Sequence, residues 1–274
     1  MKIDYEEAKR RLRQIMPMGL TAETEGREPG KMSLENAICF ATGEPPGEEP
    51  SCVAELDLEY STILSSAGWS SDLVRGEALL PLVIAQLGTT DTDRETWADQ
   101  LVLGTVKRVL PLALDAVDMT DHAQACRSVE TFDDAKKVLK AAENSLAAAK
   151  GTLASAYALS AVAAAATAVD DTDVASAASA TVYCSNAVFH ASGASARDAL
   201  LREAVAVALD AYALTSNKEP SKESHKQSVA LHDIRAHIEQ LILSHKKARE
   251  SGATMCDVSI VINQLTEILA MLDR

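Results

Sequence analysis

Histidine and cysteine residues at helical spacing are the first places where this sequence of 274 residues could do chemistry. His122 and Cys126 are four residues apart on a predicted helix, close to Asp118 and Asp121, so all four side chains could approach one face. A zinc site needs three or four such ligands, and no second pair of histidine and cysteine follows. We therefore expect an ordinary exposed turn and no metal site.

A nucleophile with a partner base would be the next kind of site. Cys184 and His190 are six residues apart, which on a helix separates their directions by roughly 120°, so they cannot pair locally. A buried structural thiol is the simpler interpretation. Ser195 follows a glycine as in a nucleophile elbow, but the final glycine and the preceding strand are missing, so we expect it to cap a helix. Ser244 and Lys247 fit Ser-x-x-Lys without its companion motifs. We predict no catalytic residue and no cofactor.

Three aspartates, Asp170, Asp171 and Asp173, resemble half of a calcium-binding loop. The glycine and the bidentate glutamate that such a loop requires are absent at the matching offsets. We expect the aspartates to cap the helix that begins near Val174.

Tryptophan and arginine supply the candidate binding residues. Trp69 and Trp97 are the only tryptophans; they could anchor a partner or fill the core of a chain with 4% aromatic residues. Arg75, Arg94 and Arg108 are the best candidates for holding a small anion in a helical body.

A basic segment at residues 221–250 holds four of the six histidines in an acidic chain. It is either a solvated amphipathic helix or a contact surface whose positive charge rises below about pH 6.5. His232, Arg235 and His237 are its candidate contact residues.

The net charge of −14 bears on partners. Proteins that bind nucleic acid usually carry a basic surface, so we expect no nucleic-acid partner. We expect a protein partner, and a basic one, while leaving a small-molecule anion and homo-oligomerisation open. Five cysteines without Cys-x-x-Cys spacing indicate reduced thiols and a cytoplasmic protein.

Targeting and membrane segments are not expected. The first sixteen residues are charged throughout, unlike a signal peptide. The most apolar run, 153–169, is mostly alanine, contains Ser155 and Ser160, and is followed by aspartates, whereas a membrane span is longer and richer in leucine, isoleucine and phenylalanine. We expect a soluble protein with no membrane partner.

The stretch 140–214 organises the rest of the chain. It is rich in alanine, the strongest helix former, and contains no proline. Breaks at 170–173 and 192–195 predict three antiparallel helices whose small side chains let the axes come close. The sequence therefore predicts an all-α protein, a multi-helix bundle of close-packed Ala-rich antiparallel helices with a C-terminal helical hairpin.

Segments rich in residues that interrupt helices, such as proline and glycine, divide the chain into three expected parts. Residues 1–50 comprise a short helix, stopped by Pro17, and a loop rich in proline and glycine. Residues 51–215 form the Ala-rich body, and residues 216–274 a linker and a helical hairpin that packs on it.

Within the body we expect Ser51 to cap a helix that runs to about residue 65, and two further helices at 72–87 and 92–117. Pro81 and Pro111 lie inside the last two, which predicts a pair of kinked helices side by side as a curved hairpin. The segment 33–40 is too short to assign as helix or strand.

One pattern resembles known families. A leucine/proline helix ending in Gly88-Thr89, then Ala98-Asp99, then Arg108 and Pro111, then Ala-rich helices, resembles uncharacterised Ala-rich proteins encoded by bacteriophages. Trp97-Ala98 before an Ala-rich bundle is similar to the Imm5-like immunity domain. The resemblance covers about residues 70–215 and implies an all-helical protein of the bacterial host cytoplasm, with a proposed role in neutralising toxins or defences.

Four function classes follow. The leading hypothesis is a non-enzymatic binding protein of immunity or counter-defence type that neutralises a partner by occlusion. The alternatives are a helical protein that sequesters a small molecule or nucleotide signal, a phage structural component, and an enzyme that uses dispersed acidic residues.

Overall fold

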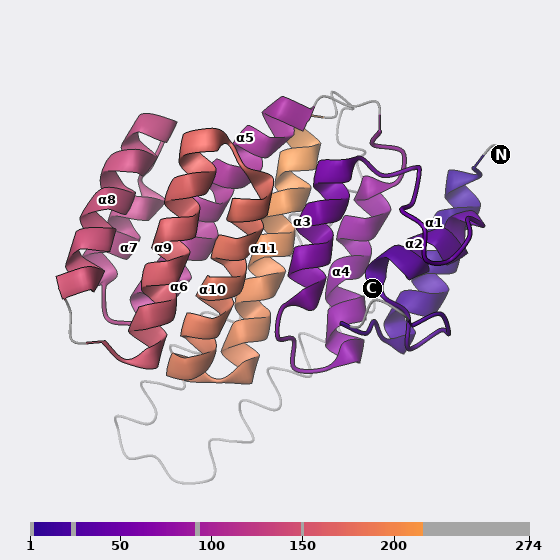
Figure 1. Ribbon diagram of the computed structural model, residues 1–274, viewed down its shortest axis with the longest axis horizontal. Helices are drawn as coiled ribbons and strands as arrows, with labels where there is room; N and C mark the ends of the chain where they lie inside the picture. The colour runs from indigo at the N-terminus through magenta and orange to yellow at the C-terminus, as the bar shows by residue number, and fades with distance from the viewer. Residues whose placement is uncertain (1–2, 23–25, 91–93, 149–150, 216–274) are drawn as a thin grey trace, which may run out of the picture. The chain divides into compact units, whose positions relative to one another are not determined.

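The chain folds into helices, as its composition predicts. A computed structural model describes residues 3–22, 26–90, 94–148 and 151–215, and these contain no β-strand, only an isolated bridge between Leu20 and Met32 (Figure 1). The described residues belong to one compact unit. The predicted linker and C-terminal hairpin, with His232, Arg235 and His237, lie outside the described residues.

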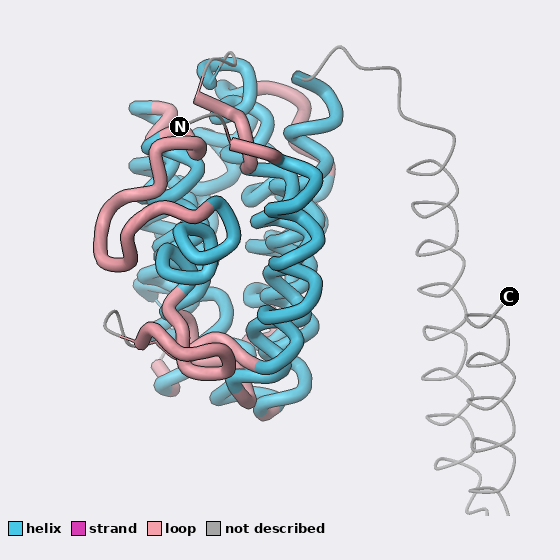
Figure 2. The backbone as a smooth tube through the Cα atoms, turned by 90° about the vertical axis from the view of Figure 1, so that its right-hand side faces the viewer, coloured by secondary structure: helices cyan, strands magenta, loops and turns pink. Residues whose placement is uncertain are grey.

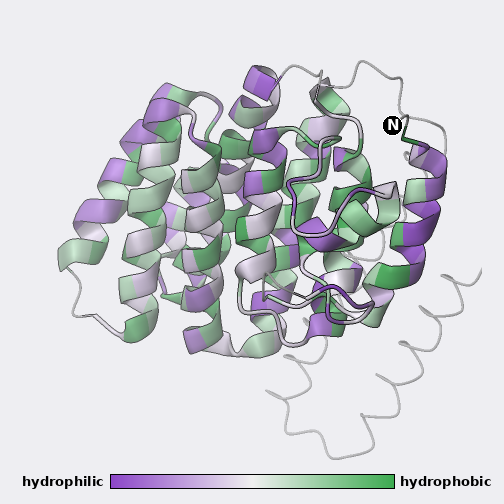
Figure 3. Cartoon of the chain, turned by 45° about the vertical axis from the view of Figure 1, so that its right-hand side comes forward, coloured by the Kyte–Doolittle hydropathy of each residue, from purple (hydrophilic) through white to green (hydrophobic). Residues whose placement is uncertain are grey.

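The N-terminal helix α1 (Tyr5–Ile15) is amphipathic. The side chain of Asp4 caps it by accepting hydrogen bonds from the backbone amides of Glu6 and Glu7, both at 3.1 Å. Its apolar positions Ala8 and Leu12 are buried, and Figure 3 shows hydrophilic and hydrophobic residues alternating along this helix beside the N-terminus label. A short 3₁₀ turn with Pro17, η1 (Met16–Met18), ends the helix as predicted.

The ambiguous segment after it is a helix, α2 (Leu34–Thr42), capped by Ser33. Helix α3 (Glu55–Ser66) begins four residues after Ser51, so the prediction that Ser51 caps it is wrong. Pro50 closes a backbone turn to Val53, and Ser51 instead bonds the side chain of Glu44.

Helix α4 (Asp72–Gln86) is capped by Ser71 and passes close to η1. A Cβ atom added at Gly76 would lie 2.1 Å from the carbonyl oxygen of Met16, so only glycine allows this approach. The helix contains Pro81 without a break in its assigned span.

The predicted helix 92–117 is present, but it is interrupted. It consists of α5 (Arg94–Gly104), a π-helical segment, η2 (Thr105–Val109), and α6 (Leu110–Ala116). The π-helical segment ends at Val109, two residues before Pro111, which has no amide hydrogen to donate within the helix.

The predicted curved hairpin of α4 and α5 is wrong. Each of these helices packs against α11 (Ala194–Thr215), and α4 also packs against η1 and α3. A Cβ added at Gly104 would lie 2.5 Å from Cγ1 of Val207, which shows how closely α5 approaches α11.

The remaining helices are α7 (Thr120–Arg127), α8 (Phe132–Ala148), α9 (Leu153–Asp171) and α10 (Val174–Ser192). Both predicted breaks are confirmed. The first of the three expected helices is in fact two, α8 and α9.

Local side chains account for these helix ends. Thr152 caps α9, and Asp173 caps α10 as predicted. The same prediction is wrong for Asp170 and Asp171, which are the last two residues of α9. Helix α11 begins at Ala194, so Ser195 lies in its first turn and does not cap it; Gly193, at φ +89°, reverses the chain instead.

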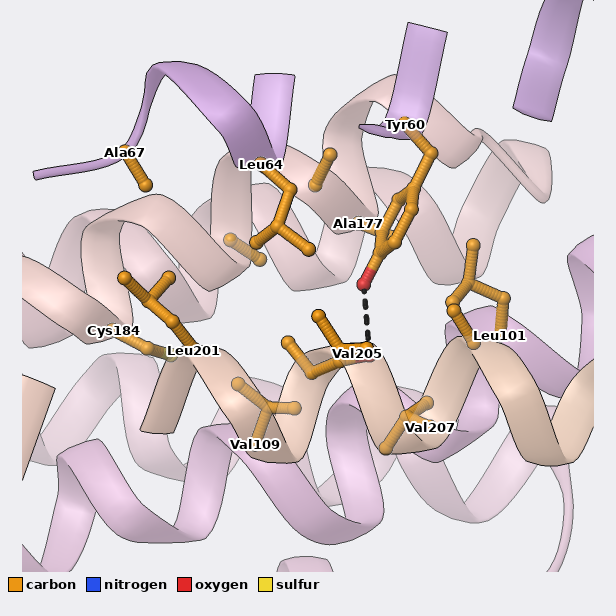
Figure 4. Close-up of a cluster of buried hydrophobic side chains, with 14 of the residues drawn as sticks. Tyr60, Leu64, Ala67, Leu101, Val109, Ala177, Cys184, Leu201, Val205 and Val207 are labelled. Carbon is orange, nitrogen blue, oxygen red and sulfur yellow. Dashed lines mark hydrogen bonds between the residues drawn. The ribbon is translucent and has the colours of Figure 1, made fainter. Parts of the chain in front are cut away.

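The core lies where α10 meets α9, α11, α3 and α6. Figure 4 shows it as a cluster of Leu, Val and Ala side chains with Tyr60, whose hydroxyl donates to the carbonyl oxygen of Ala204 at 3.3 Å. Figure 2 shows the helix axes running close to one direction. Small side chains at the contacts allow this close packing.

The length and apolar composition of helix α9 bear on the predicted absence of a membrane partner. It is long and apolar enough to cross a membrane by length and composition, and 39% of its most apolar window is buried within the described part of the chain. Core helices pass the same test, so the expectation of no membrane partner stays a prediction.

Candidate functional site

Two of the candidate binding residues, Arg94 and Trp97, meet in a buried polar cluster. The Nη1 atom of Arg94 donates to both carboxylate oxygens of Asp57, at 2.7 and 2.8 Å, and Asp57 is fully buried. The guanidinium lies 5.6 Å from the ring of Trp97 and 5.5 Å from the ring of Tyr212, which stack on each other at 5.2 Å. This cluster joins α3, α5 and α11.

The electrostatics of the cluster are those of a buried ion pair. Burial raises the pKa of Asp57 above its ordinary value of 3.8, although hydrogen bonds from Thr89 and Arg94 and the charge of Arg94 oppose the shift. Burial also raises the pKa of Tyr212. Gln86 donates to the carbonyl oxygen of Asp57 at 2.8 Å. The arrangement holds helices together and leaves Trp97 fully buried.

The other tryptophan and Arg75 also have structural surroundings. Trp69 is 6% exposed, and its indole N–H donates to the carbonyl oxygen of Leu64 at 3.0 Å. Arg75 is 6% exposed and donates to the carbonyl oxygen of Leu20 and to Asp72. Both tryptophans therefore fill the core, which was one of the two roles the sequence allowed.

Arg108 is half-buried and is the most exposed of the three candidate arginines. Its Nε donates to Glu203 at 2.8 Å, and its Nη1 pairs with Asp210, both on α11. Beside it lies a shallow groove of about 280 Å³ between the α5–η2 segment and α11, lined also by Lys107, Glu130 and Leu214.

The three arginines do not converge. Each guanidinium is already neutralised by different carboxylates. The pairs are Arg75 with Asp72, Arg94 with Asp57, and Arg108 with Glu203 and Asp210. The geometry thus gives the small-anion hypothesis no support, and binding by these residues stays a prediction.

The thiols are placed for packing. Burial is the main cause that raises the pKa of Cys39 and Cys52 to about 11 and of Cys126 to about 12, and it raises the pKa of Cys184 further. A thiol with a raised pKa is a poor nucleophile at neutral pH. The four described cysteines are buried and free.

The prediction of an exposed turn at His122 and Cys126 is wrong, because both lie on α7, where Cys126 is buried and His122 is half-buried. A ring nitrogen of His122, Nε2, lies 2.9 Å from the hydroxyl oxygen of Ser145 on α8. No group of three or more potential metal ligands occurs among the described residues.

A different segment has the features of a binding surface. Residues 32–74 contain eight carboxylates and no lysine, arginine or histidine, so this acidic segment carries more than half of the net charge of −14. It comprises α2, the loop rich in proline and glycine, α3 and the start of α4.

Within the acidic segment the carboxylates have different environments. Asp57 and Asp72 pair with arginines, and Glu44 accepts hydrogen bonds from Thr42 and Ser51, which fixes the loop. Four carboxylates are exposed and have no ion pair within the described part of the chain: Glu48, Glu49, Glu55 and Glu59.

The same segment exposes apolar side chains. Phe40 on α2 is 44% exposed and Leu56 on α3 is 37% exposed. Aromatic side chains are enriched at the centre of protein interfaces, whereas glutamate and aspartate are depleted there and charged groups belong to the polar rim. The candidate residues predicted from the sequence are arginines, tryptophans and histidines, and none but Trp69 lies in this segment. The absence of any cation from 32 to 74 is the sequence signal that indicates it.

No family model, curated protein or solved structure matches the chain.

Proposed function

We propose that this chain is a non-enzymatic binding protein that neutralises a basic protein partner by covering its surface. The observation that supports the proposal best is the acidic segment, with eight carboxylates, no cation and four exposed carboxylates free of ion pairs in the described structure.

Electrostatics make such a segment effective against a basic target. Carboxylates that are not paired within the chain keep their field in solution, steer a basic protein toward the segment and raise its association rate. The same field repels the phosphates of nucleic acids. Phe40 and Leu56 add apolar surface that an incoming partner would bury.

The resemblance to immunity domains and phage proteins suggests the biological setting. We propose an immunity or counter-defence protein that acts in the bacterial host cytoplasm by occluding its target. Occlusion needs a rigid scaffold and an exposed surface, and it needs no reactive group. The buried thiols and paired arginines agree with such a role.

The test is affinity capture from host lysate with two matched quadruple variants. The first changes the four exposed carboxylates of the acidic segment to amides: E48Q, E49Q, E55Q and E59Q. The control changes four exposed carboxylates elsewhere on the body: E77Q, D121N, E130Q and D133N. Both variants alter the net charge by the same amount.

We expect the native chain and the control to capture the same basic protein and the first variant to lose it. Purified partner should then bind the first variant at least about tenfold more weakly than the control, since four charges act together. Equal loss with both variants would show a non-specific charge effect, and equal retention would show that the acidic segment is not the contact surface; either result overturns the proposal.

A further inference from the structure

A second surface of the body has the opposite character. The exposed side of α9 and α10 lacks charged side chains along most of its length, and the two helices lie side by side in the layer nearest the viewer in Figure 1. We call it the neutral face. It consists of Leu153, Tyr157, Ser160 and Ala164 on α9 and Ser179, Tyr183, Asn186 and His190 on α10.

Contacts fix the register of the neutral face. The rings of Tyr157 and His190 stack at 5.4 Å with an interplanar angle of 2°. Because α9 and α10 are antiparallel neighbours joined by a short turn, one further turn along each helix brings Ser160 beside Asn186, and the next brings Ala164 beside Tyr183. The eight residues thus form a continuous surface.

The charge pattern sets the neutral face apart. From residue 151 to 196 the sequence contains no lysine or arginine, and its only acidic residues are Asp170, Asp171 and Asp173. All three lie at the turn between α9 and α10, at one end of the face. At the other end Asp118, from the connection between α6 and α7, lines a hollow beside Leu153 and His190, and between these two ends the face carries no charged side chain of α9 or α10.

The neutral face exposes two large apolar side chains, Leu153 at 58% and Tyr183 at 38%, while Tyr157, Ser160 and Asn186 are half-buried. At the end opposite the aspartates a hollow of about 390 Å³ opens between Leu153, His190 and residues 116–118, which include Asp118. The face is therefore uncharged and of mixed polarity between its two ends, and its lack of charge is the feature that distinguishes it.

We propose that the neutral face binds the same face of a second copy of this chain. Two chains that each carry a net charge of −14 repel each other wherever their carboxylates approach. The neutral face is where two copies can meet without placing like charges together. A two-fold axis would bring equivalent residues into contact, as in most homodimers.

The size of the surface fits this role. A helix of 19 residues is about 28 Å long, and two adjacent helices are about 20 Å wide, so the face offers about 560 Å². Two such faces would bury about 1,100 Å² in total, which is above the roughly 1,000 Å² that a biological interface needs and below the range of about 1,200–2,000 Å² of stable complexes, so the dimer would be a weak one. Small side chains such as Ala164 and Ser179 would let helices of the two copies approach closely.

A lipid surface is the competing occupant, because α9 is apolar enough for one. Helices that lie on membranes carry lysine and arginine beside their apolar side, and the α9–α10 pair has neither. The net charge would also oppose binding to anionic lipid. The charge pattern therefore favours a second copy.

The test compares two double variants of the full chain by sedimentation equilibrium. L153E and Y183E place two charges on the neutral face. The control, M18E and Y5E, places the same charges at matched sites outside both proposed surfaces: Met18 is 54% exposed, and Tyr5 is 38% exposed, as Tyr183 is. Thermal unfolding of each variant checks that the body stays folded.

We expect the native chain and the control to form a dimer of twice the 29.1 kDa chain mass at about 100 µM or below. The L153E and Y183E variant should raise the dimer dissociation constant at least about tenfold, since four like charges meet across the two-fold axis. A native chain that stays monomeric, or a dimer weakened equally by both double variants, overturns the proposal. So does binding of the monomeric native chain to phosphatidylcholine vesicles that L153E and Y183E abolish.

Discussion

At the scale of single residues, the ion pair between Asp57 and Arg94 is the most consequential contact. Asp57 is fully buried, and a buried charge without its partner costs far more than an exposed one. Arg94 lies over Trp97 and Tyr212, so the pair also sets how α5 meets α11. Arg108, which is 36% exposed, makes comparable ion pairs in a position where solvent screens them.

We predict that R94M lowers the free energy of unfolding by about 3–5 kcal/mol, because it leaves the carboxylate of Asp57 buried and unpaired. The D57N and R94M double variant should recover much of this loss. R108M is the control and should cost about 1 kcal/mol or less. Urea denaturation at neutral pH measures all three, and a loss in R94M no larger than in R108M would contradict the prediction.

The same carboxyl group makes a pH-dependent contribution. Burial raises the pKa of Asp57 in the folded chain above 3.8, so between 3.8 and the raised pKa the folded state binds more protons than the unfolded state. The contribution of Asp57 to stability is therefore complete below the unfolded pKa and falls as pH rises through the window. Urea denaturation across that range should show this fall in the native chain and not in D57N.

At the scale of elements, the composition of the chain predicted which segments are helical better than it predicted where each helix begins and ends. Alanine content and two breaks were enough to place α9, α10 and α11, because helix propensity and caps such as Asp173 are local properties. The separation of α8 from α9 was missed, since Gly151 alone is a weak break in an alanine-rich run. Ser51 does not cap α3 because a turn from Pro50 to Val53 delays the start of the helix to Glu55, and the Ser51 hydroxyl donates to Glu44.

The position of each arginine could not be predicted from sequence, because it depends on contacts between distant helices. Arg94 pairs with a residue 37 positions away and Arg108 with residues 95 and 102 positions away. The same reason explains why α4 and α5 pack on α11 and do not form a hairpin. No local pattern carries that information.

Two alanines of α9 test which side of the helix is packed. Ala165 is 1% exposed and Ala163 is exposed, although the two are only two residues apart. We predict that A165L lowers the free energy of unfolding by about 1–3 kcal/mol through overpacking. A163L should change it by less than about 0.5 kcal/mol. Chemical denaturation of both variants decides, and similar losses would mean that the outer side of α9 is also packed within the monomer.

At the scale of the whole molecule, charge is distributed very unevenly along the chain. Residues 32–74 carry eight carboxylates and no cation, while residues 151–196 carry three aspartates at one turn. Residues 216–274, which hold the basic segment, are neutral in net formal charge, so the whole excess of −14 belongs to the first 215 residues. This uneven distribution underlies both proposals, a basic partner at the acidic segment and a second copy at the neutral face.

The two surfaces should respond to salt in opposite directions. Raising NaCl from about 0.1 M to about 1 M shortens the screening length from about 10 Å to about 3 Å. Attraction between the acidic segment and a basic partner is lost over that range, so we predict that the partner's dissociation constant rises at least about tenfold. Repulsion between two copies is screened as well, while apolar contact at the neutral face is kept, so the dimer dissociation constant should fall severalfold.

Titration calorimetry with the partner and sedimentation of the chain alone measure the two slopes, that is, how each dissociation constant changes with salt concentration. The amide variant at Glu48, Glu49, Glu55 and Glu59 should flatten both slopes, because each depends on the same charges. If dimer and complex weaken together as salt rises, then charge pairs hold the dimer, and the neutral face is not where the copies meet.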